Sequence, residues 1–477
     1  MTADHPPRTM TADGFEGTAL ERVLRDTNHQ LVLCIYTRWA VPVGAQMAQS
    51  VEGFRHTKLR IVVAIILVSL SWPAVSCGRS SSHINTAACA QPAARPMAII
   101  ELPGNPFQAI PTSDGCHVFV SLAGPTEPSD PRRPPRPGAP MGGLAVVSRV
   151  GGEPSLTRVV QLEGSPWGMA LTRDDGLLIV ASDDRVAFID PARLIAGSAD
   201  AILGYLKDAP TAGRFYANVT PDDRWLFLSD ESAKAISVVD LAKARASGFD
   251  NSAVVGQIPT GQAPIALTFS MDHQFLYTTS QVAPAAYGWP AVCSAPGSEA
   301  ARQGSKYAEG AILVVDVSRA TRDPANAVIG AAPAGCNPVR LATSPSGEVA
   351  YVSARTDNAL LAFDTKRLLT DPTHALMGRV PVGDAPVGVA VLNGGARIAV
   401  TNSNRFGDSD ATQNLTIIDA QKIASGAAAV LGTVPAGVFP RELRVTEDQK
   451  TLLLTNFGSK NLAMIDIARL PLERRER

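Results

Sequence analysis

Short hydrophobic stretches of about five residues recur along most of this chain, each bounded by turn-forming residues. The clearest copy begins at Pro338, whose apolar strand leads to the turn Ser-Pro-Ser-Gly at residues 344–347. Two more apolar stretches follow, at residues 349–353 and 359–364. β-Branched and aromatic stretches between Gly, Pro, Asn, Asp and Ser are typical of β-strands. A pattern that recurs in this way indicates a repeat protein.

Seven copies align on the residue that begins the first strand. These residues are Pro106, Pro166, Arg214, Pro264, Pro338, Pro386 and Pro440, so that arginine replaces proline in the third copy. Each first strand leads through a polar turn to a second strand. A third strand ends in aspartate in all copies but the first, and a fourth strand precedes the next copy. Four consecutive strands per copy are typical of a propeller blade.

The last copy ends after its third strand, at residues 462–466, and therefore lacks an outer strand. Residues 98–102 form an unassigned apolar strand near the other end of the repeats. Pairing these two segments would close the ring and remove its exposed sheet edges. We therefore predict an all-β fold: a seven-bladed β-propeller of four-stranded antiparallel blades over residues 98–468, closed by the N-terminal strand and followed by a charged tail at 469–477.

Several strands carry a recognisable ending. The segments are Tyr351-Val352-Ser353, Val400-Thr401-Asn402 and Leu453-Leu454-Thr455-Asn456 in second strands, and Val238-Val239-Asp240 in a third strand. They resemble the YVTN family of β-propeller repeats from bacterial and archaeal surface proteins, over about residues 98–468. The resemblance implies the fold. It implies no single activity, because the family includes surface proteins, binding modules and lactonase-like members, and because the matched residues are strand and turn positions.

A targeting signal precedes the repeats. A basic segment at residues 55–60 is followed by an apolar stretch at 61–72 and by small residues before Cys77. This order predicts a secretory signal over residues 54–76, too short for a spanning helix. The cysteine directly after it resembles that of a bacterial lipobox, although Ala74 stands where leucine is usual. We expect a lipid on Cys77, a tether over residues 77–97, and export to the periplasm or outer membrane.

The region before the signal is harder to interpret. Residues 1–53 carry neither the repeat nor a clear core pattern, which indicates a start assigned too far upstream or a disordered extension. Simple secretion without a lipid is one alternative. A genuine cytoplasmic extension with an uncleaved anchor is another.

The remaining cysteines fall on two faces of the predicted propeller. Cys89 and Cys116 lie in connections of the face that we call the bottom, and Cys293 and Cys336 in connections of the top. Of the three possible pairings, this favours Cys89–Cys116 and Cys293–Cys336, as an exported protein permits. Four unpaired thiols are the alternative.

The first strands have mostly small residues at alternate positions, as the narrow centre of a propeller requires. Larger polar residues break this pattern and predict a ligand site at the channel. The candidate ligand-binding residues are Gln108, Trp167, Arg214, Tyr216, Arg340 and Glu442, with Asn218 and Arg444 also in exceptional positions. Convergent polar groups beside aromatic rings are typical of small-molecule sites. An Arg–Glu network with ordered water would account for the same residues.

Charge and composition narrow the chemistry. A formal net charge of −1 indicates no nucleic-acid partner, and no His/Cys cluster has zinc spacing. We expect no cofactor; Asp408 and Asp410, with nearby Asn402 and Asn404, form only a weak calcium candidate. The histidines lie away from the elaborated top face, which disfavours a histidine general base.

Three long insertions, at residues 122–143, 281–310 and 402–413, all lie on the top face. Elaborated loops on a rigid scaffold usually bind ligands. We therefore predict an exported, envelope-anchored, monomeric binding or scaffold module for an envelope protein or small molecule. The alternative is a lactonase-like hydrolase at the channel mouth, with Glu442 activating water and Arg340 or Arg444 stabilising the oxyanion. A partner domain for a periplasmic redox enzyme is a third option.

Overall fold

The computed structural model describes residues 95–124, 142–207, 214–294, 306–407 and 413–471, together with Cys89 and Gly304. The side chains of Arg214 and Phe215 are not described. The chain divides into two units, residues 1–84 and 85–477, and all described residues belong to the second. Cys77 and the predicted signal therefore lie outside the described residues.

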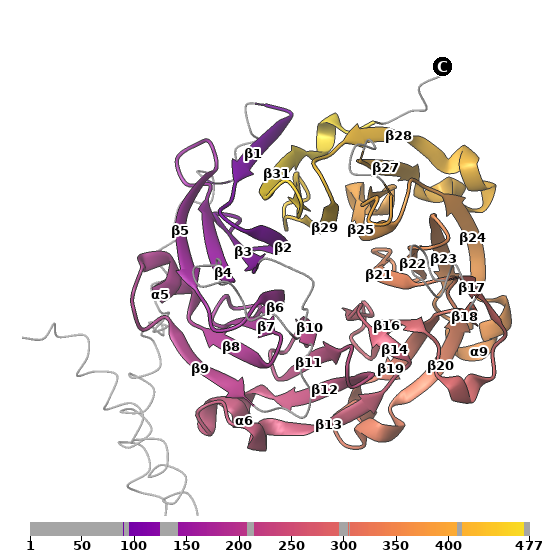
Figure 1. The fold of residues 1–477 in the computed structure, drawn as a ribbon, viewed down its shortest axis with the longest axis horizontal. Helices are drawn as coiled ribbons and strands as arrows, with labels where there is room; N and C mark the ends of the chain where they lie inside the picture. The colour runs from indigo at the N-terminus through magenta and orange to yellow at the C-terminus, as the bar shows by residue number, and fades with distance from the viewer. Residues whose placement is uncertain are drawn as a thin grey trace, which may run out of the picture. The chain divides into compact units, whose positions relative to one another are not determined.

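Seven antiparallel sheets surround a central axis, which confirms the predicted all-β seven-bladed propeller (Figure 1). Blades one to three are β2 (Asn105–Pro111), β3 (His117–Ala123), β4 (Gly143–Ser148), β5 (Ser155–Gln161); β6 (Pro166–Leu171), β7 (Leu178–Ser182), β8 (Arg185–Ile189), β9 (Ile202–Lys207); and β10 (Arg214–Val219), β11 (Trp225–Asp230), β12 (Ala235–Asp240), β13 (Val254–Pro259). Blades four and five are β14 (Gln262–Pro264), β15 (Thr268–Phe269), β16 (Phe275–Val282), β19 (Ala311–Asp316), β20 (Val328–Pro333); and β21 (Pro338–Thr343), β22 (Val349–Ala354), β23 (Ala359–Asp364), β24 (Leu376–Pro381). Blades six and seven are β25 (Pro386–Leu392), β26 (Arg397–Asn402), β27 (Asn414–Asp419), β28 (Val430–Pro435); and β29 (Pro440–Val445), β30 (Thr451–Asn456), β31 (Asn461–Asp466), β1 (Met97–Glu101).

The ring is closed by the two ends of the repeat region. Strand β1 pairs antiparallel with β31, from Met97 opposite Ile465 to Glu101 opposite Asn461. The last blade thus gains its fourth strand from the start of the repeat region, as predicted. Strand β1 thereby covers the edge of β31 that would otherwise be unpaired.

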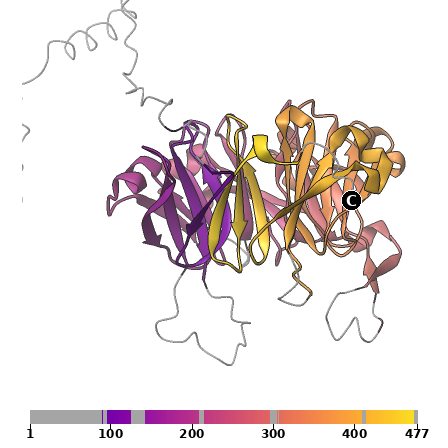
Figure 2. The ribbon, with the colours of Figure 1, turned by 90° about the horizontal axis from the view of Figure 1, so that it is seen from above.

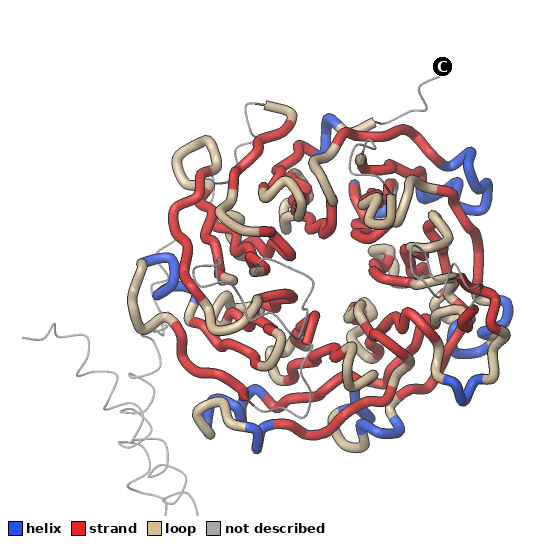
Figure 3. The backbone as a smooth tube through the Cα atoms, in the orientation of Figure 1, coloured by secondary structure: helices blue, strands red, loops and turns tan. Residues whose placement is uncertain are grey.

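Short helices follow several third strands and lie at the rim of the propeller (Figure 3). They are α5 (Pro191–Ala196), α6 (Leu241–Ala246), α8 (Val317–Ala320) and α9 (Arg367–Thr370), with 3-10 turns at Asn251–Ala253, Ala285–Tyr287, Pro324–Asn326, Pro372–His374, Asn393–Gly395, Ala420–Ala429 and Ile467–Arg469. The aspartate that ends the third strand caps the next turn: Asp190 accepts from the backbone N–H of Arg193, and Asp240 from that of Lys243. This explains the recurrent aspartate. Among the described residues, no helix combines the length and apolarity needed to cross a membrane.

The inner strands contain a bulge directly after their first residue. In blade five, for example, the register with β22 shifts between Pro338 and Leu341. A hydroxyl of the second strand fills the gap: Ser353 Oγ accepts from the N–H of Arg340 at 3.0 Å and donates to the carbonyl of Val387 in the next blade at 2.7 Å. The recurrent Ser or Thr of the YVTN-like ending therefore joins neighbouring blades.

The same hydroxyl bridge closes the ring. Thr455 Oγ1 accepts from the N–H of Glu442 at 3.1 Å and donates to the carbonyl of Phe107 in blade one at 3.2 Å. In blade four the bulge widens to a break, so that the inner strand is split into β14 and β15. There Thr279 still bridges the N–H of Ala266 and the carbonyl of Val339.

The hydrophobic core lies between adjacent blades. In one such layer, Ile179 and Phe188 of blade two and Leu228 and Val239 of blade three are fully buried in the same cluster. A single blade cannot bury its faces alone, so stacking around the ring supplies the core. In the side view, the strands of each blade run roughly along the propeller axis (Figure 2).

Two disulfides link Cys89 to Cys116 and Cys293 to Cys336. Both pairings are as predicted from the two faces. The second ties the hairpin of β17 (Ala291–Ser294) and β18 (Lys306–Ala308) to the segment before β21. The hairpin belongs to the insertion between the second and third strands of blade four.

Candidate functional site

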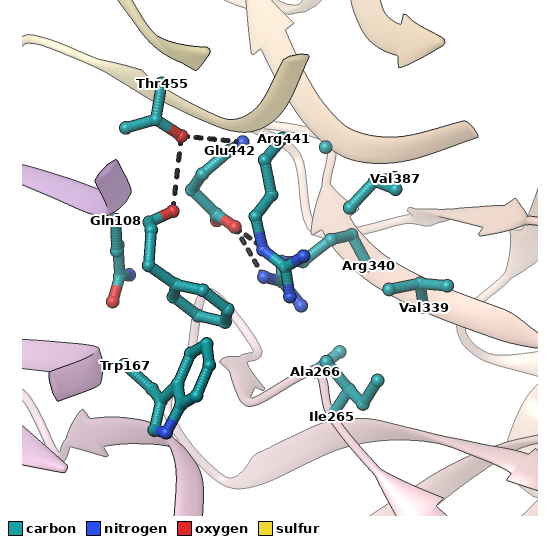
Figure 4. Close-up of polar contacts among 12 residues, drawn as sticks. Gln108, Trp167, Ile265, Ala266, Val339, Arg340, Val387, Arg441, Glu442 and Thr455 are labelled. Carbon is teal, nitrogen blue, oxygen red and sulfur yellow. Dashed lines mark hydrogen bonds and ion pairs between the residues drawn. The ribbon is translucent and has the colours of Figure 1, made fainter. Parts of the chain in front are cut away.

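Large apolar side chains from all seven blades meet at the axis of the propeller. We call this set the collar: Phe107, Ala123, Tyr216, Ile265, Val339, Val387 and Phe457, with Trp167, Leu267 and Phe439 partly buried against them. The ring of Phe107 packs edge-on to Trp167 at 5.0 Å and lies 5.5 Å from Tyr216. Figure 4 shows several collar residues around the side chain of Arg441. Five collar residues directly follow the proline that begins a repeat copy, near the bulge: Phe107, Trp167, Ile265, Val339 and Val387.

A cavity of about 490 Å³ lies on one side of the collar, which we call lower. Its walls are later residues of the inner strands from all seven blades, such as Leu171, Phe269 and Val391. Its charged residues are Arg340, Glu442 and Arg444. The three charges share a partly enclosed space whose walls mix polar and apolar side chains.

Arg340 and Glu442 form an ion pair across the axis, from blades five and seven. Nε and Nη2 of Arg340 lie 2.7 and 2.6 Å from the same carboxylate oxygen, Oε2 of Glu442 (Figure 4). The Arg340 guanidinium also lies 3.8 Å above the ring of Tyr216. Burial lowers the pKa of Arg340 to about 10, the Glu442 charge opposes this, and nearby Arg441 adds to it. The guanidinium therefore remains charged at neutral pH.

Several polar atoms in the lower cavity are not satisfied by the described protein. Oε1 of Glu442 makes no hydrogen bond to a described residue, and the guanidinium of Arg444, an exposed residue, forms neither a hydrogen bond nor an ion pair with one. Burial within the channel lowers the pKa of Arg444, while the Glu442 charge opposes the shift. The phenol oxygen of Tyr216 and Nη1 of Arg340 are buried without a partner. Buried groups such as the Tyr216 hydroxyl and Nη1 of Arg340 are rare unless water or a ligand completes them.

The other predicted binding residues have structural contacts. Oε1 of Gln108 accepts from the N–H of Met169 at 2.5 Å and so joins blades one and two. The indole of Trp167 donates to Asp183 at 2.5 Å, and burial raises the pKa of that carboxyl, against the hydrogen bond, which lowers it. The side chain of Arg214 lies outside the described residues. The structure thus brings Gln108, Tyr216, Arg340, Glu442 and Arg444 to the lower cavity, although Gln108 is also held by its contact with Met169.

Four charged residues on the other side of the collar were missed in the sequence: Glu231, Arg355, Arg405 and Arg441. Arg441 had a visible signal, because it occupies the position after the first strand residue, where the other copies have Phe, Trp, Phe, Ile, Val and Val. The other three follow second strands, whose ends meet near the axis only in the folded ring. Single polar residues in such loops are common and carried no signal of their own.

The calcium candidate cannot be placed. Asp408 and Asp410 lie outside the described residues. Within the described ranges, no group of three or more His, Cys, Asp or Glu side chains could hold a metal ion. In the same region, Asn402 is engaged inside its own blade, donating to Asn414 and Thr416.

The fold is similar to known propellers. Hydrazine synthase from Kuenenia stuttgartiensis matches with a TM-score of 0.54 at 17% identity, over 77% of this chain and 96% of that chain. The Cps50 (Swd1) β-propeller domain from Myceliophteria thermophila matches with a TM-score of 0.50 at 11% identity, over 78% of this chain and 99% of that chain. No protein-family model and no curated protein matches the sequence. Similarity at these identities establishes the fold alone.

Proposed function

We propose that this protein is an exported binding module that takes up a small polar molecule in the lower cavity of its axis. The observation that carries the proposal is the pair of unpartnered groups there, Oε1 of Glu442 and the guanidinium of Arg444, in a cavity of about 490 Å³. The ligand would carry an acidic group for Arg444 and a hydrogen-bond donor for Glu442. Convergent polar groups beside apolar side chains in a concave space are typical of ligand sites.

Export is part of the proposal. Two disulfides join segments that are far apart in sequence, and such bonds persist mainly in oxidising compartments. The signal-like segment before Cys77 and the resemblance to YVTN repeats of surface proteins support the same location, with a lipid on Cys77 as the anchor. Mass spectrometry of the mature protein tests this: an N-terminus at Cys77 with a lipid mass is expected, and retention of residues 1–53 would refute it.

Binding is favoured over lactone hydrolysis because the proposed base is already engaged. Two nitrogens of Arg340 hold one oxygen of Glu442, which restrains the carboxylate. A hydrolase would also need a second group to protonate the leaving oxygen. No described histidine lines the lower cavity.

A ligand screen by thermal shift tests the proposal. The panel contains hydroxy acids, amino acids and lactones, and the full chain is compared with Arg444→Gln and Glu442→Gln. We expect some compounds to raise the Tm of the wild type and to raise the Tm of either variant much less. Equal shifts in all three proteins would exclude the cavity as the site, and turnover of a lactone that depends on Glu442 would favour the hydrolase instead.

A further inference from the structure

A second charged cluster lies on the upper side of the collar, where the second strands of the blades end. Its members come from four blades: Glu231 follows β11, Arg355 follows β22, Arg405 lies in the loop after β26, and Arg441 is on β29. We call the three cations the upper arginine cluster. They belong to neither the Arg340–Glu442 ion pair nor the walls of the lower cavity.

Each of the three arginines makes the charged form of its neighbours less favourable. Burial lowers the pKa of Arg355 to about 9, and the charges of Arg405 and Arg441 add to this effect, while Glu231 opposes it. Burial lowers the pKa of Arg441 to about 10, against the attraction of Glu442 and Glu231. Partial desolvation and the charge of Arg441 also lower the pKa of Arg405, although the residue itself is exposed. All three remain cations at neutral pH, so their repulsion persists in the folded protein.

The cluster retains hydrogen-bond donors without acceptors. Nη2 of Arg355 donates to Gln281 at 3.0 Å and to Asn337 at 2.9 Å, which fixes the side chain, but its Nε is buried without a partner. Nε of Arg441 is likewise buried and unpartnered. Arg405 forms no ion pair or hydrogen bond with a described residue, while its side chain is exposed. Unpaired buried donors beside a free cation point to an acceptor from outside the chain.

Aromatic rings cover the faces of the guanidinium groups. Arg441 lies 4.0 Å above the ring of Phe107 and 5.5 and 5.6 Å from the rings of Phe439 and Phe457. Arg405 lies 5.8 Å from Phe439. Stacking leaves the edges of a guanidinium as its free donors, and these edges match the two oxygens of a carboxylate.

An apolar surface adjoins the same donors. Arg355 lies 5.7 Å from the ring of Phe406, whose residue is 43% exposed. Val438, next to Phe439, is 47% exposed. A ligand whose charged end meets the arginines would therefore place its remainder against exposed apolar side chains.

Glu231 does not neutralise the cluster. Burial raises its pKa even though Arg355, Arg441 and Arg405 lower it, and Asp230 raises it further. Glu231 forms no ion pair with a described residue. The charge of Glu231 makes the site unfavourable for an anion of high charge.

We propose that the upper arginine cluster binds an organic carboxylate whose remainder is apolar or aromatic. The three guanidinium groups supply donors for one carboxylate, and Phe406, Phe439 and Val438 supply contact for the hydrocarbon part. A monoanion fits better than phosphate because the Glu231 carboxylate lies beside the cations. This site is separate from the lower cavity and does not depend on the function proposed for it.

Isothermal titration calorimetry on the full chain tests the proposal with three probes: phenylacetate, its neutral analogue phenylacetamide, and inorganic phosphate. We expect phenylacetate to bind at least about tenfold more tightly than either of the others. Phenylacetamide binding as tightly as phenylacetate, or no binding of phenylacetate, would overturn the proposal. Tighter binding of phosphate would also overturn it and would indicate a phosphate site.

Two variants locate the probe. Arg405→Gln should weaken phenylacetate binding at least about tenfold while leaving Tm nearly unchanged, because Arg405 is exposed and holds no hydrogen bond. Arg441→Met should weaken binding similarly. Arg245→Gln, an exposed arginine on α6 at the rim, is the matched control. Wild-type affinity in Arg405→Gln, or loss of affinity only in Arg444→Gln, would place the probe elsewhere and refute the proposal.

Discussion

Replacing Arg441 by methionine should make the protein more stable, although Arg441 lies at the centre of the fold. The other six blades have an apolar residue at this position. The backbone contact of the position is independent of the side chain, because the carbonyl of Arg441 accepts from Thr401. Methionine keeps the length of the side chain and removes its charge.

The expected gain follows from opposing contributions. Burial lowers the pKa of Arg441 to about 10, which corresponds to about 3 kcal/mol of unfavourable free energy for the charged form. Stacking on Phe107 at 4.0 Å returns about 1–2 kcal/mol. A methionine sulfur against the same rings contributes about 0.3–1.5 kcal/mol. The net change is a stabilisation of about 1–3 kcal/mol, or a rise in Tm of about 1–3 °C for a domain of this size.

Calorimetric melting of Arg441→Met beside the wild type measures this gain. Because the pKa of Arg441 is lowered in the fold, its cost is fully present below that pKa and is lost only as the pH rises above it, so the gain should be equal at pH 6 and pH 8. Arg245→Met at the exposed rim should change stability by less than about 0.5 kcal/mol. A loss of more than about 1 kcal/mol in Arg441→Met would refute the reasoning and show that the buried cation stabilises the ring.

Three further outcomes are expected. Burial raises the pKa of Glu231, so its competing charge is lost as the pH falls through that pKa. Phenylacetate should therefore bind the wild type more tightly on acidification, whereas it should bind Glu231→Gln tightly at every pH. Equal pH profiles of the two proteins in calorimetry would contradict this. Thr455→Val removes the hydroxyl that bridges Glu442 and Phe107 and should lower the free energy of unfolding in urea by about 1–3 kcal/mol. Unchanged stability would show that the contact between the last and first blades does not need this hydroxyl. A Cys293→Ser, Cys336→Ser double variant removes the disulfide that closes a sequence separation of 43 residues. Its free energy of unfolding should be lower by about 4 kcal/mol. A Tm that is insensitive to both the mutations and a reductant would exclude this contribution.

The repeat allowed the fold to be predicted because its recurrent residues make local contacts. The Ser or Thr of the second strand, as in Ser353, binds one backbone group in its own blade and one in the next. The aspartate after the third strand caps a turn. Such contacts involve neighbours in the repeat, so they recur in the sequence at a constant spacing. The same regularity made the faces of the four cysteines predictable.

The candidate sites were predicted less completely. Arg340 and Glu442 broke the pattern of small residues, and the structure pairs them across 102 positions of the chain. Gln108 broke the same pattern, yet its side chain joins two blades. Gln108 also lines the lower cavity. A polar residue at such a position can satisfy a neighbour, face the cavity or do both, and only the folded structure shows which.

The sequence by itself determined the number of blades, the strand that closes the ring and the pairing of the cysteines, because these depend on spacing along the chain. Only the tertiary structure revealed the upper arginine cluster. Arg355, Arg405 and Arg441 lie on three different blades, and their mutual repulsion exists only after closure of the ring brings those blades to a common axis. Charge density at a point in space is a property of the folded ring, and no repeat unit contains it.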